Sequence, residues 1–239
     1  LGFRLRSAVS LDDHTRVRIN EAEFRLLHTG RTAVVVELGG GLDLRTRAVR
    51  LNGGTVAHLR ECNALLPGSG TTFPDETLMV RLILDAAMTN EVATLREARI
   101  LLTPTTRATN QITITGQVDC SKPDAIGGRL SVTAAALDAT RYYDLWERMA
   151  ASAQTGAESA SIRPGTSGDP AAIRLPADQF TVDVDIQRLF LREVEVADCR
   201  ATLQVAGGRL ALKPCRLTLN NAPVSLAMDL DLGVPGWRY

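Results

Sequence analysis

Aromatic residues are scarce in this chain, at 4% of 239 residues, and neither sign of charge is in excess. Lysine plus arginine and aspartate plus glutamate both number 27, so the formal net charge is zero. Nucleic-acid-binding domains normally carry a basic excess, and this balance therefore argues against a nucleic-acid partner. It gives no reason to expect an anionic membrane surface as partner either. With so few large rings, the composition suits many slender strands better than a compact core.

Long apolar runs are also missing. Residues 33–36 form one short run, and Asp85 interrupts another at residues 82–88. A membrane-spanning helix needs about 20 consecutive apolar residues, so none is predicted here. No basic segment leads into an apolar stretch, so no signal peptide is predicted. Because strand-like alternation is already under way at residue 2, we interpret the chain as a piece of a longer polypeptide, whose anchor lies outside it.

Residue patterns that carry chemistry are few. The three histidines are scattered, and the four cysteines include no C-x-x-C spacing, so no metal site is predicted. The glycines at 39–41 and 53–54 fit neither G-x-G-x-x-G nor a Walker motif, so no nucleotide cofactor is predicted. Asp183 and Asp185 share one face of a strand, which admits an acid/base pair but is more typical of a solvated strand surface. We predict that the chain is not an enzyme.

The dominant pattern is alternation of apolar and polar residues. It is clearest over residues 194–219, on both sides of Gly207-Gly208, and predicts a β-hairpin. Similar strand–turn–strand units recur along the chain, and each needs its neighbours to cover its apolar face. Glycines 39–41 indicate a bulge or a close backbone approach, and Asn52-Gly53-Gly54 indicates a turn.

Two cysteines, Cys199 and Cys215, flank the Gly207-Gly208 turn almost symmetrically. This placement brings them close across the predicted hairpin, subject to a bulge at Pro214. Two interpretations stay open: a cross-strand disulfide, or two small apolar side chains in the core. Cys62 and Cys120 are expected to be unpaired.

Two segments have helical spacing instead. Residues 55–66 place apolar residues three and four apart and end at Pro67-Gly68. Residues 138–151 begin at Asp138, a good N-cap, and carry one apolar face that we expect to lie on the sheet. The residues of this face are Tyr142, Leu145, Trp146 and Met149.

The sequence predicts three regions. Residues 1–151 form a β-rich region with the two helices, residues 152–176 are rich in Ser, Ala and Gly and indicate a flexible linker, and residues 177–239 form a β-hairpin repeat. The expected fold is mainly β, an extended, curved, mostly antiparallel sheet of repeated hairpins.

Within residues 176–239, a strand near Asp198 is followed by A-x-L-x-x-x-x-G-x-L-x-L-x-P and a further strand. The residues at these positions are Asp198, Ala201, Leu203, Gly208, Leu210, Leu212 and Pro214. This pattern resembles that of the AsmA family of bacterial envelope proteins, in which a strand ends near Asn or Asp before the same motif. Cys199 and Cys215 stand where the family usually has apolar residues. The likeness is weaker over 95–150.

The resemblance implies a periplasmic or cell-envelope protein, anchored to the inner membrane by an N-terminal segment and involved in outer-membrane biogenesis. The wider, TamB-like group carries phospholipid along an apolar β-groove between the inner and outer membranes. The resemblance implies no catalytic residue in this chain. Two interpretations stay open: a lipid-binding groove, or a structural scaffold without lipid cargo. The lipid-contact candidates, which could equally pack against a helix or a second sheet, are Leu203, Val205, Leu210, Leu212, Leu217 and Leu219.

Overall fold

The computed structural model describes residues 1–239 except 13–14, 64–77, 123, 157–171 and 174. The described residues form one large sheet and two helices, α1 (Leu59–Asn63) and α2 (Thr140–Gly156). The strands are β1 (Gly2–Asp12), β2 (Arg16–His28), β3 (Arg31–Asp43), β4 (Ala48–His58), β5 (Met79–Thr89), β6 (Val92–Leu102), β7 (Gln111–Asp119), β8 (Ile126–Ala134), β9 (Leu137–Asp138), β10 (Ala177–Leu191), β11 (Val194–Ala206), β12 (Arg209–Leu219) and β13 (Ala222–Asp231).

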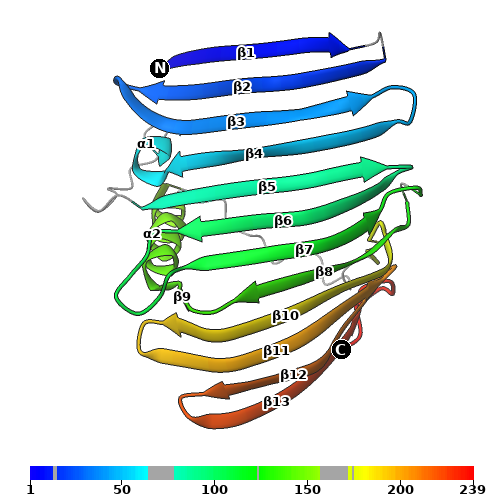
Figure 1. Cartoon of the computed structure of the whole chain (residues 1–239). Helices are drawn as coiled ribbons and strands as arrows, with labels where there is room; N and C mark the ends of the chain where they lie inside the picture. Colours follow the sequence, from blue (N-terminus) through cyan, green and yellow to red (C-terminus); the bar gives the residue numbers. More distant parts are fainter. Residues whose placement is uncertain (13–14, 64–77, 123, 157–171, 174) are drawn as a thin grey trace.

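The sheet follows the chain almost without crossovers. Each strand from β1 to β8 pairs antiparallel with the next, and β10 to β13 do the same. The exception is β10, which pairs parallel with β8 and with the two-residue β9. A parallel neighbour needs a long connection, and here that connection contains α2. The expected curved, mostly antiparallel sheet is confirmed, and residues on both sides of the predicted linker belong to the same sheet (Figure 1).

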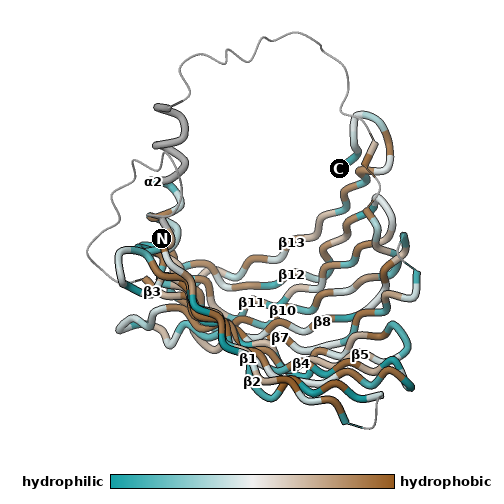
Figure 2. Tube along the Cα trace, turned by 90° about the horizontal axis from the view of Figure 1, so that it is seen from above, coloured by the Kyte–Doolittle hydropathy of each residue, from teal (hydrophilic) through white to brown (hydrophobic). Residues whose placement is uncertain are grey.

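The strands bend, so the sheet forms a trough. Figure 2 looks along the stack of strands and shows α2 at one rim, on the concave side. Glycine allows part of this bending: Gly40 has a φ of 153°, and a Cβ there would lie 2.1 Å from the Arg50 carbonyl oxygen. The expected close backbone approach at residues 39–41 is confirmed, because only a residue without a side chain fits.

The sheet has one face of mostly apolar side chains and one face of mostly polar side chains. Directly paired residues point to the same face of the sheet, so the strand register assigns each strand residue to one face or the other. One row across six strands reads Gly116, Leu130, Val182, Leu203, Leu212 and Met228. The neighbouring row, one residue along each strand, reads Gln117, Arg129, Thr181, Gln204, Ala211 and Asp229. We call these the apolar face and the polar face.

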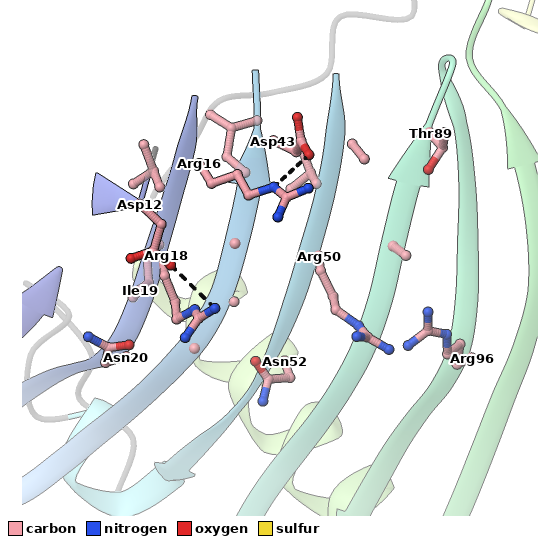
Figure 3. A pocket seen from close by; sticks show the side chains of 18 residues that line it. Asp12, Arg16, Arg18, Ile19, Asn20, Asp43, Arg50, Asn52, Thr89 and Arg96 are labelled. Carbon is pink, nitrogen blue, oxygen red and sulfur yellow. Dashed lines mark hydrogen bonds and ion pairs between the residues drawn. The ribbon is translucent and has the colours of Figure 1, made fainter. Parts of the chain in front are cut away.

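The apolar face is the concave one. In Figure 1, α2 lies behind the strands, and the polar-face side chains drawn in Figure 3 project from the opposite side of the sheet.

Several local predictions need correction. Residues 55–58 belong to β4, and α1 begins only at Leu59, because β4 pairs with both β3 and β5 as far as Ala57. Residues 64–66 of the predicted helix lie outside the described residues. Asn52-Gly53-Gly54 is not a turn but the middle of β4. Its glycine is needed for packing, since a Cβ at Gly53 would lie 2.2 Å from the Glu37 carbonyl oxygen.

The second predicted helix is close to its expected range. It begins at Thr140 and ends at Gly156, so residues 152–156 of the predicted linker are helical. Residues 157–171 and 174 of that linker lie outside the described residues. The central hairpin is confirmed, with β11 and β12 joined at Gly207-Gly208.

Candidate functional site

The apolar face is the main candidate site, because it presents aliphatic side chains from every long strand of the sheet. All six predicted lipid-contact residues lie on it. Leu203 pairs with Leu212 and Val205 with Leu210 across the central hairpin, and Leu217 and Leu219 continue the same face toward β13. The register therefore brings these six residues together, and adjoining rows from β1 to β10 extend the same surface far beyond them.

Much of this face is open to solvent within the described residues. Most large apolar strand residues with high exposure lie on it, and they come from both ends and the middle of the sheet. Exposed fractions rise from 38% at Leu38 and 39% at Met88 to 45% at Met228 and 77% at Phe3 on the outer strand. An apolar surface of this extent usually marks a binding site.

The two helices leave most of the trough uncovered. The short α1 lies against β3 and β4, where Glu61 is 3.5 Å from Arg31 and 3.6 Å from His28. Tyr142 of α2 reaches the strand ends, donating a hydrogen bond from its hydroxyl to the Met79 carbonyl and accepting one from the Thr103 amide, each 2.8 Å long. These contacts hold both helices at one rim of the sheet.

The expected apolar face of α2 is confirmed only in part. Leu145 is buried at 6% exposure, but Trp146 is 63% exposed and does not lie on the sheet. The side chain of Met149 is outside the described residues. Polar contacts hold the solvent side of the helix instead. Arg192 lies in the β10–β11 turn and pairs with Asp144 at 2.7 Å and with Glu147. Its guanidinium lies 5.1 Å from the centre of the Tyr143 ring.

A buried polar junction supports the rim. Asp138, predicted to cap the second helix, lies in β9 two residues before α2 and takes part in this junction, which was not predicted. Asp138 is only 5% exposed and accepts hydrogen bonds from Thr105, Arg107 and the Thr140 amide. Its own amide donates to the side chain of Asn110, which is fully buried. Burial acts to raise the pKa of Asp138, but the hydrogen bonds outweigh burial and hold the pKa below its ordinary value.

The four cysteines are free thiols. Cys215 is buried on the apolar face, directly opposite Ala201 of β11. Cys199 lies two residues before Ala201 on the same strand, so the two thiols are diagonal neighbours. Burial, with a smaller contribution from Cys215 and Asp185, raises the pKa of the Cys199 thiol. Cys215 is a core side chain and Cys199 is half-buried, and their oxidation to a disulfide stays a prediction.

The aspartates of β10 lie on the polar face, in ion pairs. Asp183 is 2.6 Å from Arg129, and Asp185 is 3.6 Å from Arg200. The Arg129 guanidinium and the Thr202 hydroxyl hold the pKa of Asp183 below its ordinary value. The expected solvated strand surface is therefore what the structure has at these positions. Within the described ranges, no group of three or more His, Cys, Asp or Glu residues could hold a metal ion.

Searches against protein-family models, curated proteins and solved structures give no match to this chain. Among the described helices, neither combines the length and the apolar character needed to cross a bilayer.

Proposed function

We propose that this chain is a phospholipid-binding segment of an AsmA-like envelope protein, and that its apolar face holds acyl chains. The observation that carries the proposal is the continuous concave apolar surface, which the described helices cover only at one rim. Each acyl methylene removed from water contributes about 0.8 kcal/mol, so a few contacts along one chain give useful affinity.

The shape of the trough supports movement of lipid along it as well as binding. The row of paired residues that contains Leu203 and Leu212 crosses the sheet from β1 to β13, and it contains no charged residue. Aliphatic side chains do not specify a position along an acyl chain, so a lipid can slide between neighbouring rows at little cost. Its headgroup stays at the open side of the trough, in water. We propose conduction between the inner and outer membranes as the role of the parent protein, with an anchor outside this chain.

A second candidate function is a structural scaffold for outer-membrane assembly without lipid cargo. The outer edges of β1 and β13 favour it, because among the described residues no strand pairs with either edge and only Arg238 bridges the end of β13, at Asp231. Such edges recruit further strands. The two functions differ in whether the apolar face is occupied by lipid.

Native mass spectrometry of protein purified without detergent tests the lipid proposal. We expect phospholipid to copurify with the unmodified chain and to be lost in Leu212→Lys, which places a charge in the trough. Ala211→Lys is the matched control, since it changes the adjacent residue on the polar face of the same strand. Lipid-free protein that is folded by circular dichroism would favour the scaffold. Equal lipid in both variants would contradict the proposal that the lipid occupies the trough at Leu212.

A further inference from the structure

A pocket on the polar face is lined by four arginines together with several residues that have little or no side chain. It has a volume of about 740 Å³ and lies over β1 to β6, toward the ends of these strands that are remote from α2 (Figure 3). Its floor consists of residues with little or no side chain, among them Gly39, Gly41 and Ala87. Long side chains from the neighbouring strands form its walls, so the hollow follows directly from the residue sizes.

The strand register explains how the pocket is built. Arg18 pairs with Gly41, Gly41 with Arg50, and Arg50 with Ala87, so arginines alternate with small residues in one row across four strands. Neighbouring strands are about 4.8 Å apart, which leaves roughly 10 Å between the backbones that carry Arg18 and Arg50. A group larger than water fits between these two side chains.

The charges in the pocket do not balance. Arg16 pairs with Asp43 at 3.1 Å, Arg18 with Asp12 at 3.3 Å, and Arg96 with Asp85 at 3.5 Å. Among the described residues, no carboxylate lies within ion-pair distance of Arg50. Four guanidinium groups therefore face three carboxylates, and the pocket retains one positive charge.

Two arginines of the pocket face each other. Figure 3 shows the guanidinium groups of Arg50 and Arg96 pointing toward each other above β5. Asp85 offsets the charge of Arg96 only, so an anion between the two guanidinium groups would lower their mutual repulsion. The planar donors of arginine suit the oxygens of phosphate. Asn52 and Thr89 add neutral polar groups to the lining.

We propose that this pocket binds a phosphoryl anion, held between Arg50 and Arg96 with Arg18 at its margin. The site lies on the opposite face of the sheet from the apolar trough, so it is independent of the proposed lipid function. The same chemistry is offered by free inorganic phosphate, by a small phosphomonoester, and by the headgroup of an anionic lipid in a membrane surface.

Isothermal titration with inorganic phosphate at constant ionic strength tests the site. We expect saturable binding with one phosphate per chain, weakened about tenfold or more in Arg50→Gln and Arg96→Gln, since a charged hydrogen bond contributes about 1.5–3 kcal/mol. Arg200→Gln is the matched control, an exposed arginine on the polar face far from the pocket, and it should bind as the unmodified chain does.

A second arm identifies the source of the phosphoryl group. Vesicles of phosphatidylcholine with and without phosphatidic acid are floated with each protein. Flotation of the protein with the vesicles that requires phosphatidic acid and Arg50 supports a headgroup ligand, and phosphate binding without vesicle binding supports a soluble ligand. Failure to bind in both arms, or binding that is equal in Arg50→Gln and Arg200→Gln, would overturn the proposal.

Discussion

The two faces of this sheet are made by the same strands, yet they differ in almost every physical respect. Leu203 and Gln204 are neighbours on β11, but one faces an open apolar trough and the other a surface of ion pairs. On the polar face, charges such as Arg200 and Asp185 satisfy each other across strands. On the apolar face, away from the rim where α1 and α2 pack, the aliphatic side chains of the described residues contact one another and solvent. The polar face is satisfied by contacts within the sheet, whereas the apolar face leaves large aliphatic side chains exposed, and we propose that lipid covers them.

The largest effect should come from the bend of the trough. Gly40→Ala introduces a Cβ on the apolar face about where the Arg50 carbonyl lies, so we expect a loss of at least about 3 kcal/mol of stability. Gly41→Ala, one residue along on the polar face, meets its nearest neighbour at 3.4 Å and should cost less than about 1 kcal/mol. Urea unfolding of both variants measures the difference, and equal losses would show that the bend does not depend on Gly40.

The second-largest effect on stability should come from a carboxylate placed on the apolar face, compared with one placed on the polar face. Leu203→Asp removes apolar contacts with Leu212 and Val182 and puts a carboxylate among aliphatic groups, for an expected loss of about 2 kcal/mol. Gln204→Asp changes the adjacent polar-face residue and should stay within about 0.5 kcal/mol of the unmodified protein. If the two free energies of unfolding changed alike, the two faces would be energetically equivalent and the trough would not be a distinct apolar surface.

The buried junction at the rim should show itself in the pH dependence of stability. The folded pKa of Asp138 is below its ordinary value, so ionised Asp138 stabilises the fold above about pH 4 and this contribution is lost as pH falls through the folded pKa. We therefore expect Asp138→Asn to be destabilised at neutral pH and its difference from the unmodified protein to shrink in acid. Urea titrations at several pH values measure this, and a constant difference would contradict the assignment.

The smallest effect should come from single ion pairs of the polar face. Arg200 is 74% exposed and 3.6 Å from Asp185, so its substitution by glutamine should change the free energy of unfolding by less than about 0.5 kcal/mol. Added salt should leave that difference nearly unchanged, because little electrostatic energy is there to screen. A loss close to that of Leu203→Asp would mean that the polar face contributes more to stability than exposed pairs usually do.

The sequence predicted the strands and the apolar positions better than the breaks between them. Alternation around Gly207-Gly208 identified the central hairpin and its six inward residues because a strand's two-residue period depends only on local geometry. The same reasoning failed at residues 55–58, where apolar spacing suggested a helix, because pairing with β3 and β5 outweighs a helical pattern. It failed again at Trp146, whose helix face is set by the Arg192 contacts.

The polar pocket and the buried junction were not predicted from the sequence, for a different reason. Arg18, Gly41 and Arg50 are far apart along the chain, and only the register between β2, β3 and β4 places them in one row. Asp138 was predicted as a helix cap, but its burial with Asn110 and Arg107 depends on how the β8–β10 crossover closes.

The sequence by itself determined a two-faced, mostly antiparallel sheet, because the alternation of side chains is a local property of each strand. Only the tertiary structure decided which face is concave, that β8 and β10 run parallel, and that the helices stay at one rim. These depend on the close approach of backbones at glycines such as Gly40 and on contacts such as those of Tyr142, which join residues distant in the chain.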